Sequence, residues 1–132
     1  MSGPNFAGLD KGFLVAAAAT GVDFGLGVMY NDAAGTQVKL PTSAQVFCVG
    51  VAQDTLDDAK IATGKAVVNV RMFGITRAVA GAAIAVGAPV QVGSTGKFIT
   101  AVATNNVVGW ALSPASADLD HFNLFLVPGG VF

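Results

Sequence analysis

The sequence predicts an all-β protein made of two similar small subdomains, each a barrel or clip of short strands with a short helical turn. Three observations predict this fold class. The chain contains 17 glycines, which favour tight turns, among many valines, which favour strands. All eight acidic residues are Asp, which favours turns, and Glu, which favours helices, is absent. A glycine-bounded pattern also occurs twice in the chain.

The repeated pattern is Gly, five residues, Gly, at residues 21–27 and again at residues 81–87. Large apolar residues occupy its fourth and sixth positions in both copies, and apolar segments separated by glycine turns follow in the same order. The offset between matching glycines drifts slowly, as changes in loop length produce in a duplicated unit. We therefore predict one β domain over residues 21–132 that contains two repeats, 21–74 and 81–129.

Residues 1–20 precede the first repeat and are predicted to form a flexible N-terminal arm, because glycine, proline and asparagine occur early in it. The arm nevertheless carries large apolar side chains at Phe6, Leu9, Phe13 and Leu14. Such side chains are unfavourable in water, so the arm either folds back on its own domain or docks on a neighbouring protein, for instance as an added strand.

In the first repeat, alternating apolar residues predict a half-buried strand over residues 66–74. Before this strand, Asp54 or Thr55 is expected to cap a short helix, which Gly64 then ends. Residues 75–80 are interpreted as a linker between the repeats.

In the second repeat, Ser113 followed by Pro114 predicts a second helical turn. Both faces of the strand expected at residues 122–127 are apolar, so this strand is either buried on both sides or part of a subunit contact. A short apolar tail follows it. The interface candidates in this half are Trp110, Phe125, Val131 and Phe132.

Composition excludes several classes of function. A net charge of −1 gives no electrostatic basis for binding nucleic acid. Glycine, proline or asparagine interrupts each long uncharged stretch, which argues against a transmembrane helix, and we expect no membrane partner. One histidine and one cysteine cannot assemble a zinc site, and Cys48 stands in an apolar run typical of a buried core residue. The closely spaced aspartates at residues 54–58 fit helix capping better than calcium binding. We predict no cofactor.

The sequence also argues against an enzyme. His121 is the candidate base, and Asp118 and Asp120 stand beside it. Adjacent residues on a strand point to opposite faces, so Asp120 is poorly placed to orient His121. The phosphate-loop-like sequence at residues 93–97 lacks the Ser or Thr that must follow the lysine, and a hairpin turn is expected there instead.

Residues 79–90 read Val-Ala-Gly-Ala-Ala-Ile-Ala-Val-Gly-Ala-Pro-Val, and a Gly-Lys turn follows at residues 96–97. Val-Gly-Trp-Ala-Leu then stands at residues 108–112, before a short alanine-rich turn and a last hydrophobic strand. In this order the motifs resemble the capsid decoration, or cement, proteins of tailed bacteriophages. The resemblance implies a virion protein that is made in the host cytoplasm and binds the outside of the expanded icosahedral head. It also implies a homotrimer at three-fold and quasi-three-fold sites, with the major capsid protein as its partner.

On this interpretation the arm from Ser2 to Leu14 becomes ordered on the capsid. The predicted capsid or subunit interface consists of apolar side chains of the arm, of two strands and of the tail, namely Phe6, Leu9, Phe13, Leu14, Trp110, Phe125, Val131 and Phe132. Two alternatives stay open. One is another virion component, such as a head fibre base or a tail part. The other is a small β-barrel hydrolase or ligand-binding domain, for which a deep pocket lined by His121 and an aspartate would be evidence.

Overall fold

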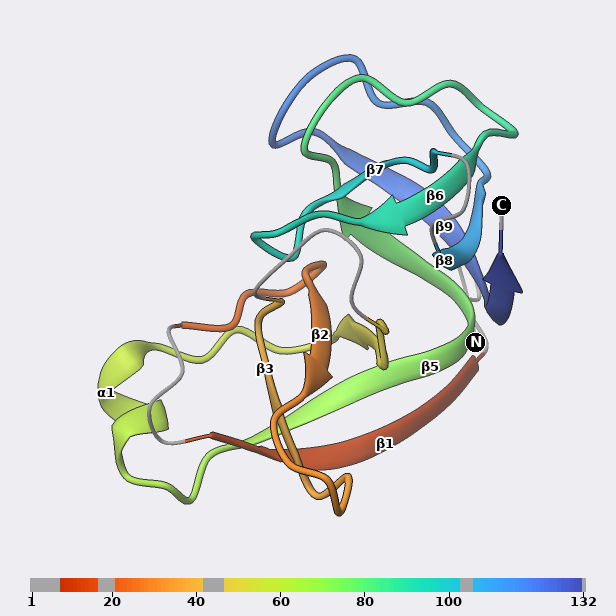
Figure 1. Ribbon diagram of the computed structural model, residues 1–132. Coiled ribbons are helices and arrows are strands. Elements are labelled where there is room, and N and C mark those ends of the chain that lie inside the picture. Colours follow the sequence, from red (N-terminus) through yellow and green to blue (C-terminus); the bar gives the residue numbers. More distant parts are fainter. Residues whose placement is uncertain (1–7, 17–20, 42–46, 103–105, 132) are drawn as a thin grey trace, which may run out of the picture.

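The computed structural model describes residues 8–16, 21–41, 47–102 and 106–131. Within these residues the chain is mainly β-structure, with one short helix, and none of its helices is long and apolar enough to cross a bilayer. The elements, drawn in Figure 1, are β1 (Gly8–Val15), β2 (Gly27–Tyr30), β3 (Gln37–Lys39), β4 (Gly50–Ala52), α1 (Asp58–Ala62), β5 (Val67–Val79), β6 (Pro89–Val92), β7 (Phe98–Thr100), β8 (Asn106–Ala111) and β9 (His121–Val131).

The first five strands close a small barrel in the order β1-β3-β2-β4-β5. Strand β1 closes it, because β1 lies antiparallel to β5 from Gly8 to Leu14 and parallel to β3 at Leu14 and Val15. The barrel core is apolar and dominated by β-branched residues, which suit a pleated, buried surface. Its buried members are Phe13, Val15, Val22, Val28, Val38, Val49, Ala52, Leu56, Ile61, Ala66, Val68 and Val70.

The second half continues the same sheet in the order β5-β9-β8-β6-β7. Its two edges also meet, because Ala80 forms a parallel bridge with Phe98 of β7 and the Gly81 N–H donates to the Phe98 carbonyl at 2.7 Å. A second core fills this half, and its large buried side chains include Ile84, Phe98, Phe122, Leu124 and Leu126.

The backbone contacts of the two halves match position by position. Strand β2 pairs with β3 and β4, and β4 with β5; likewise β6 pairs with β7 and β8, and β8 with β9. Residues 74–79 of β5 pair with β9 in the second half, just as β1 pairs with β5 in the first half. Matching residue pairs are Val28–Gly50 with Val90–Gly109, Val22–Leu56 with Ile84–Ala115, and Val15–Val38 with Ala80–Phe98.

The structure pairs different glycines of the two halves than the repeated sequence pattern suggested. Gly25, and not Gly27, corresponds to Gly87: both glycines have a positive φ, 91° and 82°. The Gly25 N–H donates to the Ala52 carbonyl at 2.9 Å, and the Gly87 N–H donates to the Ala111 carbonyl at 2.7 Å. Both copies of the pattern contain a glycine at each end, so spacing alone could not reveal the shift of two residues.

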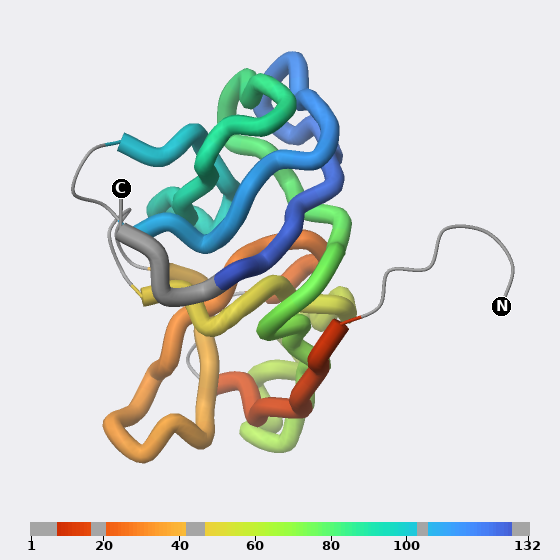
Figure 2. Tube along the Cα trace, turned by 90° about the vertical axis from the view of Figure 1, so that its right-hand side faces the viewer, coloured from red at the N-terminus to blue at the C-terminus, as the bar shows by residue number. Residues whose placement is uncertain are grey.

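Strand β5 is shared by the two halves. Its first part pairs with β4, and its second part, Gly74 to Val79, pairs with β9, so the interpretation of residues 75–80 as a linker was wrong. Gly74 stands between these parts with a φ of 109°, which residues with a Cβ rarely adopt. Figures 1 and 2 show β5 bending as it passes from one half to the other.

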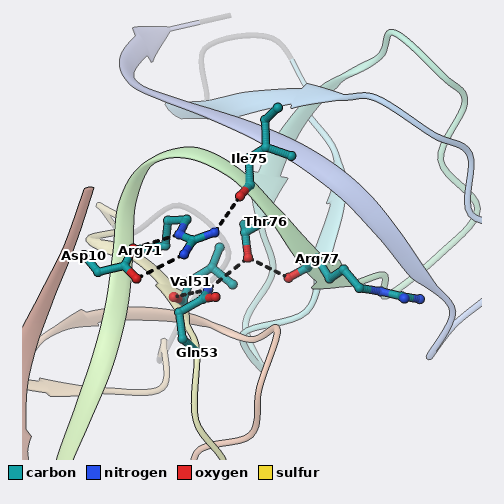
Figure 3. Close-up of polar contacts among 7 residues, drawn as sticks. All are labelled: Asp10, Val51, Gln53, Arg71, Ile75, Thr76 and Arg77. Carbon is teal, nitrogen blue, oxygen red and sulfur yellow. Dashed lines mark hydrogen bonds and ion pairs between the residues drawn. The ribbon is translucent and has the colours of Figure 1, made fainter. Parts of the chain in front are cut away.

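Polar contacts hold this bend (Figure 3). Arg71 donates from Nε to Asp10 Oδ1 at 2.7 Å and from Nη1 to the Ile75 carbonyl at 2.8 Å. Arg71 therefore links β1 to residues of β5 before and after Gly74. Gln53 Nε2 donates to Oγ1 of the buried Thr76 at 2.9 Å. The orientation of the two halves is therefore fixed by side chains on β1, on β5 and next to β4.

The predicted arm differs from the structure over residues 8–15, which form β1. Phe13 and Val15 are 3% and 1% exposed and belong to the barrel core. Phe13 is therefore a core residue and not an interface residue. Of the two possibilities for the arm, this part folds back on its own domain; Phe6 lies outside the described residues.

The two predicted helical turns had different outcomes. Helix α1 forms and Gly64 follows it with a φ of 73°, but its cap is Asp57, which accepts from the Lys60 N–H at 2.8 Å. No helix forms at residues 113–118 among the described residues; there Ala115 bridges to Ile84 across the second half. The local Ser-Pro signal was overridden by this pairing.

Replacing Asp10 by Asn is expected to lower the free energy of unfolding by about 1 kcal/mol at neutral pH, allowing for the partial solvent exposure of the ion pair. Hydrogen bonding from Arg71 lowers the pKa of Asp10 below its ordinary value. The contribution is therefore complete above about pH 5, where Asp is almost fully ionised even in the unfolded chain, and is lost as pH falls through the lowered pKa. Denaturant unfolding of both proteins between pH 2.5 and 7 measures this.

The control is Asp118→Asn, which breaks the more exposed pair with Lys97 and should cost less. A difference between wild type and Asp10→Asn that stays constant down to pH 2.5 would contradict the assigned role of the ion pair.

Candidate functional site

One face of the molecule carries a row of exposed apolar side chains. Leu9, Phe73, Phe125 and Trp110, here called the apolar strip, come from the neighbouring strands β1, β5, β9 and β8 in that order. Leu9 is 62%, Phe73 49% and Trp110 45% exposed, and Phe125 is half-buried. In Figure 1 these strands come together at the bend of β5.

Strand pairing brings the four side chains together. Leu9 lies opposite Phe73, and Trp110 lies opposite Phe125, so each pair points to the same side of the sheet. The Phe73 and Phe125 rings meet edge to face, with centroids 6.1 Å apart at 70°. Ile75 lies opposite Phe125 on β5. The result is one apolar surface with an aromatic pair at its centre, not four scattered side chains.

A bulge in the pairing of β1 with β5, in which Met72 of β5 is the extra residue, places Leu9 opposite Phe73. The register of β1 against β5 shifts between Leu9 and Asp10, so these adjacent residues face Phe73 and Arg71. Asp10 can thereby hold Arg71 while Leu9 extends the strip.

On β9, strict alternation separates core from surface. Phe122, Leu124 and Leu126 are at most 2% exposed, whereas the intervening side chains face outward, Phe125 among them. One face of this strand packs in the core and the other carries part of the strip, so the strand is not buried on both sides, and its role in a subunit contact stays a prediction.

The predicted interface residues are thus only partly brought together. Leu9, Trp110 and Phe125 are in the strip. Leu14 is 38% exposed but lies opposite Val67, at the other end of β1. The Val131 backbone pairs with Asn106, and its side chain, like Phe132, is outside the described residues.

Sequence reasoning missed Phe73. It stands out of phase with the buried alternation on β5, where Val68 and Val70 are fully buried. A large aromatic residue at an outward position of an otherwise well-patterned strand was the available signal.

A second feature is an open groove of about 490 Å³ at the seam between the halves. It is lined by Asp23, Phe24, Leu26, Val79, Thr95, Lys97, Leu119 and His121. His121 and an aspartate thus share a groove, as the hydrolase alternative requires, but the groove opens to solvent and is not a deep pocket.

The carboxylates beside His121 have structural roles. Asp120 accepts from the Ser116 and Ala117 N–H groups at 2.9 and 3.2 Å, and hydrogen bonding from the Ser116 side chain lowers the pKa of Asp120. Asp118 pairs with Lys97 at 2.8 Å. Neither is arranged to activate a histidine.

Two other predictions concern Cys48 and the turn at residues 93–97. Burial raises the pKa of the Cys48 thiol to about 12, so Cys48 is the inert core residue expected. Residues 93–97 form the expected hairpin turn, with the Gly93 N–H donating to the Lys97 carbonyl at 2.7 Å. In the part of the chain that the structure describes, no cluster of three His, Cys or Asp side chains could hold a metal ion.

The fold has a counterpart among solved structures. The N base of the head fiber protein gp8.5 in bacteriophage phi29 superimposes with a TM-score of 0.68 and 16% sequence identity, over 90% of this chain and 93% of that one. At this identity the likeness concerns the fold alone. No curated protein sequence matches the chain.

The sequence itself matches a family model. The model describes phage cement proteins and aligns with residues 9–126, which include every strand from β2 to β8, most of β1 and half of β9. The match spans both halves of the fold and all four residues of the apolar strip. This chain is therefore a member of the phage cement protein family.

Proposed function

We propose that this protein decorates the outside of the expanded icosahedral head, as a homotrimer at three-fold and quasi-three-fold sites, and holds neighbouring major capsid proteins together. Membership of the cement family makes it a capsid-stabilising structural protein of the virion. The sites, the trimer and the outer location belong to the proposal.

The observation that carries this proposal is the apolar strip. A monomer in solution gains nothing by exposing three aromatic side chains and a leucine in one row, and such patches mark contact sites. A protein that binds only the mature lattice stabilises that lattice by mass action, without any chemistry. The structural roles of the groups around His121 agree with a non-enzymatic function.

The test is binding of the purified protein to heads that were assembled without it. Expanded heads and unexpanded procapsids are each mixed with the protein, sedimented and assayed for bound copies. We expect saturable binding to expanded heads, weak binding to procapsids, and a higher temperature of DNA release from decorated heads. Equal binding to both shells, or no binding, would refute the proposal. Solution mass before and after mixing tests the trimer.

A second candidate is the base of a head fibre, which the likeness to the phi29 fibre base favours. Both candidates place the protein on the head, so cryo-electron microscopy of decorated particles separates them. A cement protein gives density over many equivalent sites that lies flat on the shell. A fibre base gives density continuous with a projecting fibre.

We also propose that residues 21–74 and 81–129 are two repeats of one ancestral unit. The matched pairings support this, and they suggest that the first repeat begins earlier, at β1, since β1 and the second part of β5 have equivalent partners. Phe6, Leu14, Val131 and Phe132 stay proposed interface residues.

A further inference from the structure

The matched pairings show which residues of the first half correspond to the apolar strip. In the second half, Trp110 lies opposite Phe125, which lies opposite Ile75. In the first half, the row at the same positions is Val51, Arg71 and Asp10, paired in the same way.

The two rows have opposite chemistry. In the first half, Val51 is fully buried, and the Arg71 guanidinium binds both carboxylate oxygens of Asp10, at 2.7 and 3.1 Å. This planar two-bond geometry satisfies the charged groups within the protein. In the second half, the row is apolar and Trp110 is half exposed. At the matched positions, Val51 is buried in the core of the second half with the Arg71–Asp10 pair beside it, whereas Trp110 is left exposed.

We propose that the apolar strip is the contact by which each copy docks on an apolar patch of the coat protein. This rests on the proposed decorating function. The ion pair adjoins the strip, because Arg71 also donates to the carbonyl of Ile75. Only the row of the second half offers a partner an aromatic surface, because Val51 in the row of the first half is buried in the core.

The size of the strip favours the coat protein over a second copy of this chain. Large aromatic side chains offer ~150–250 Å² each, so a half-exposed strip contributes roughly 300–400 Å². A stable pairwise interface needs about 800 Å² from each partner, and permanent homo-oligomers need more. A contact of this size is weak alone and becomes effective when several copies or several contacts act on one lattice.

The rim of the strip specifies the partner further. Arg77 and Asn123 lie opposite each other, two residues along the strands from Ile75 and Phe125, and Arg77 is exposed. The coat-protein patch should therefore be apolar at its centre, to receive Trp110, with a carboxylate or carbonyl group at the edge that meets Arg77.

The test replaces residues of the strip in the second half by the residues at the matched positions of the first half. The variant Trp110→Val with Phe125→Arg copies Val51 and Arg71 onto the strip. We expect its affinity for expanded heads to fall by at least about tenfold, since buried Trp anchors commonly dominate such contacts. The single variant Trp110→Val, a milder change at an exposed position, should show a smaller loss in the same direction. The control is Val86→Ser, which removes an apolar side chain that is 64% exposed and outside the strip, and should bind as wild type does.

Each outcome is decisive once thermal unfolding shows that the variants are folded. Wild type that fails to bind expanded heads refutes the proposed function itself. Wild type that binds, with the Trp110→Val variant binding equally well, refutes the docking strip alone. Variants whose solution mass drops from that of a wild-type oligomer show that the strip joins copies of this chain, which also overturns the inference.

Discussion

Deletion of residues 2–14 is expected to unfold the protein. This deletion removes seven of the eight residues of β1, including the barrel-closing pairs with β5 and the buried side chain of Phe13. Loss of a buried Phe side chain alone costs about 3–5 kcal/mol, and a small domain has only about 5–15 kcal/mol in total. Circular dichroism and a thermal scan of the truncated protein should show no cooperative transition at 25 °C and above.

The sequence alone suggested the opposite, that the folded core survives the loss of an arm. A shorter deletion, residues 2–7, separates the two views because it leaves every contact of β1 in place. This control should keep a melting temperature close to that of wild type. If the 2–14 deletion melts cooperatively near the wild-type temperature, β1 is not the integral barrel strand described above. Loss of head binding by the 2–7 deletion alone would support a docking role for Phe6.

Local patterns in the sequence were sufficient for elements whose structure depends on near neighbours. The alternation from Ala66 to Met72 predicted the first part of β5, and the Gly93–Lys97 turn followed from its composition. Both depend on side-chain period and turn chemistry within a few residues. The burial of Cys48 followed equally simply from its apolar neighbours.

Elements that depend on distant pairing could not be predicted in this way. Strand β1 begins at a glycine and contains Asp10, Lys11 and Gly12, which is a poor strand composition. It is a strand because β3 and β5 offer it partners far along the chain, from Gln37 opposite Leu14 to Gly74 opposite Gly8. The continuation of β5 through Gly74 was hidden for the same reason, since glycine usually ends a strand.

The candidate site shows this limit most clearly. Leu9 and Trp110 were selected as separate apolar residues on an arm and on a strand. Their membership of one surface follows from the strand order β1-β5-β9-β8, which places residues 9, 73, 125 and 110 side by side. Phe73 completes that surface and could be recognised only once its neighbours across the sheet were known.

Replacing Gly109 by Ala is expected to destabilise the protein by about 3 kcal/mol or more, in the upper range for single substitutions. A Cβ at this position would lie 1.9 Å from the Phe125 carbonyl oxygen, which is backbone and cannot move aside without separating β8 from β9. The melting temperature should fall by roughly 10 °C, and head binding should weaken because Trp110 and Phe125 flank the disturbed pairing.

Gly50 occupies the position in the first half that matches Gly109, and it provides a second test of the same steric argument. A Cβ at Gly50 would lie 2.2 Å from the Arg71 carbonyl oxygen, so Gly50→Ala should cost a similar free energy by opening β4 from β5. It should weaken head binding less, because it disturbs the ion-paired row and not the strip.

Gly12→Ala on β1 is the control: the added methyl meets only Val67 Cγ1 at 3.4 Å and Asn69 Oδ1 at 3.7 Å, and the change should be within about 0.5 kcal/mol of neutral. If Gly109→Ala and Gly12→Ala unfold at the same denaturant concentration, then β8 and β9 do not approach as closely as described, and the Phe125–Trp110 surface that depends on their approach is also in error.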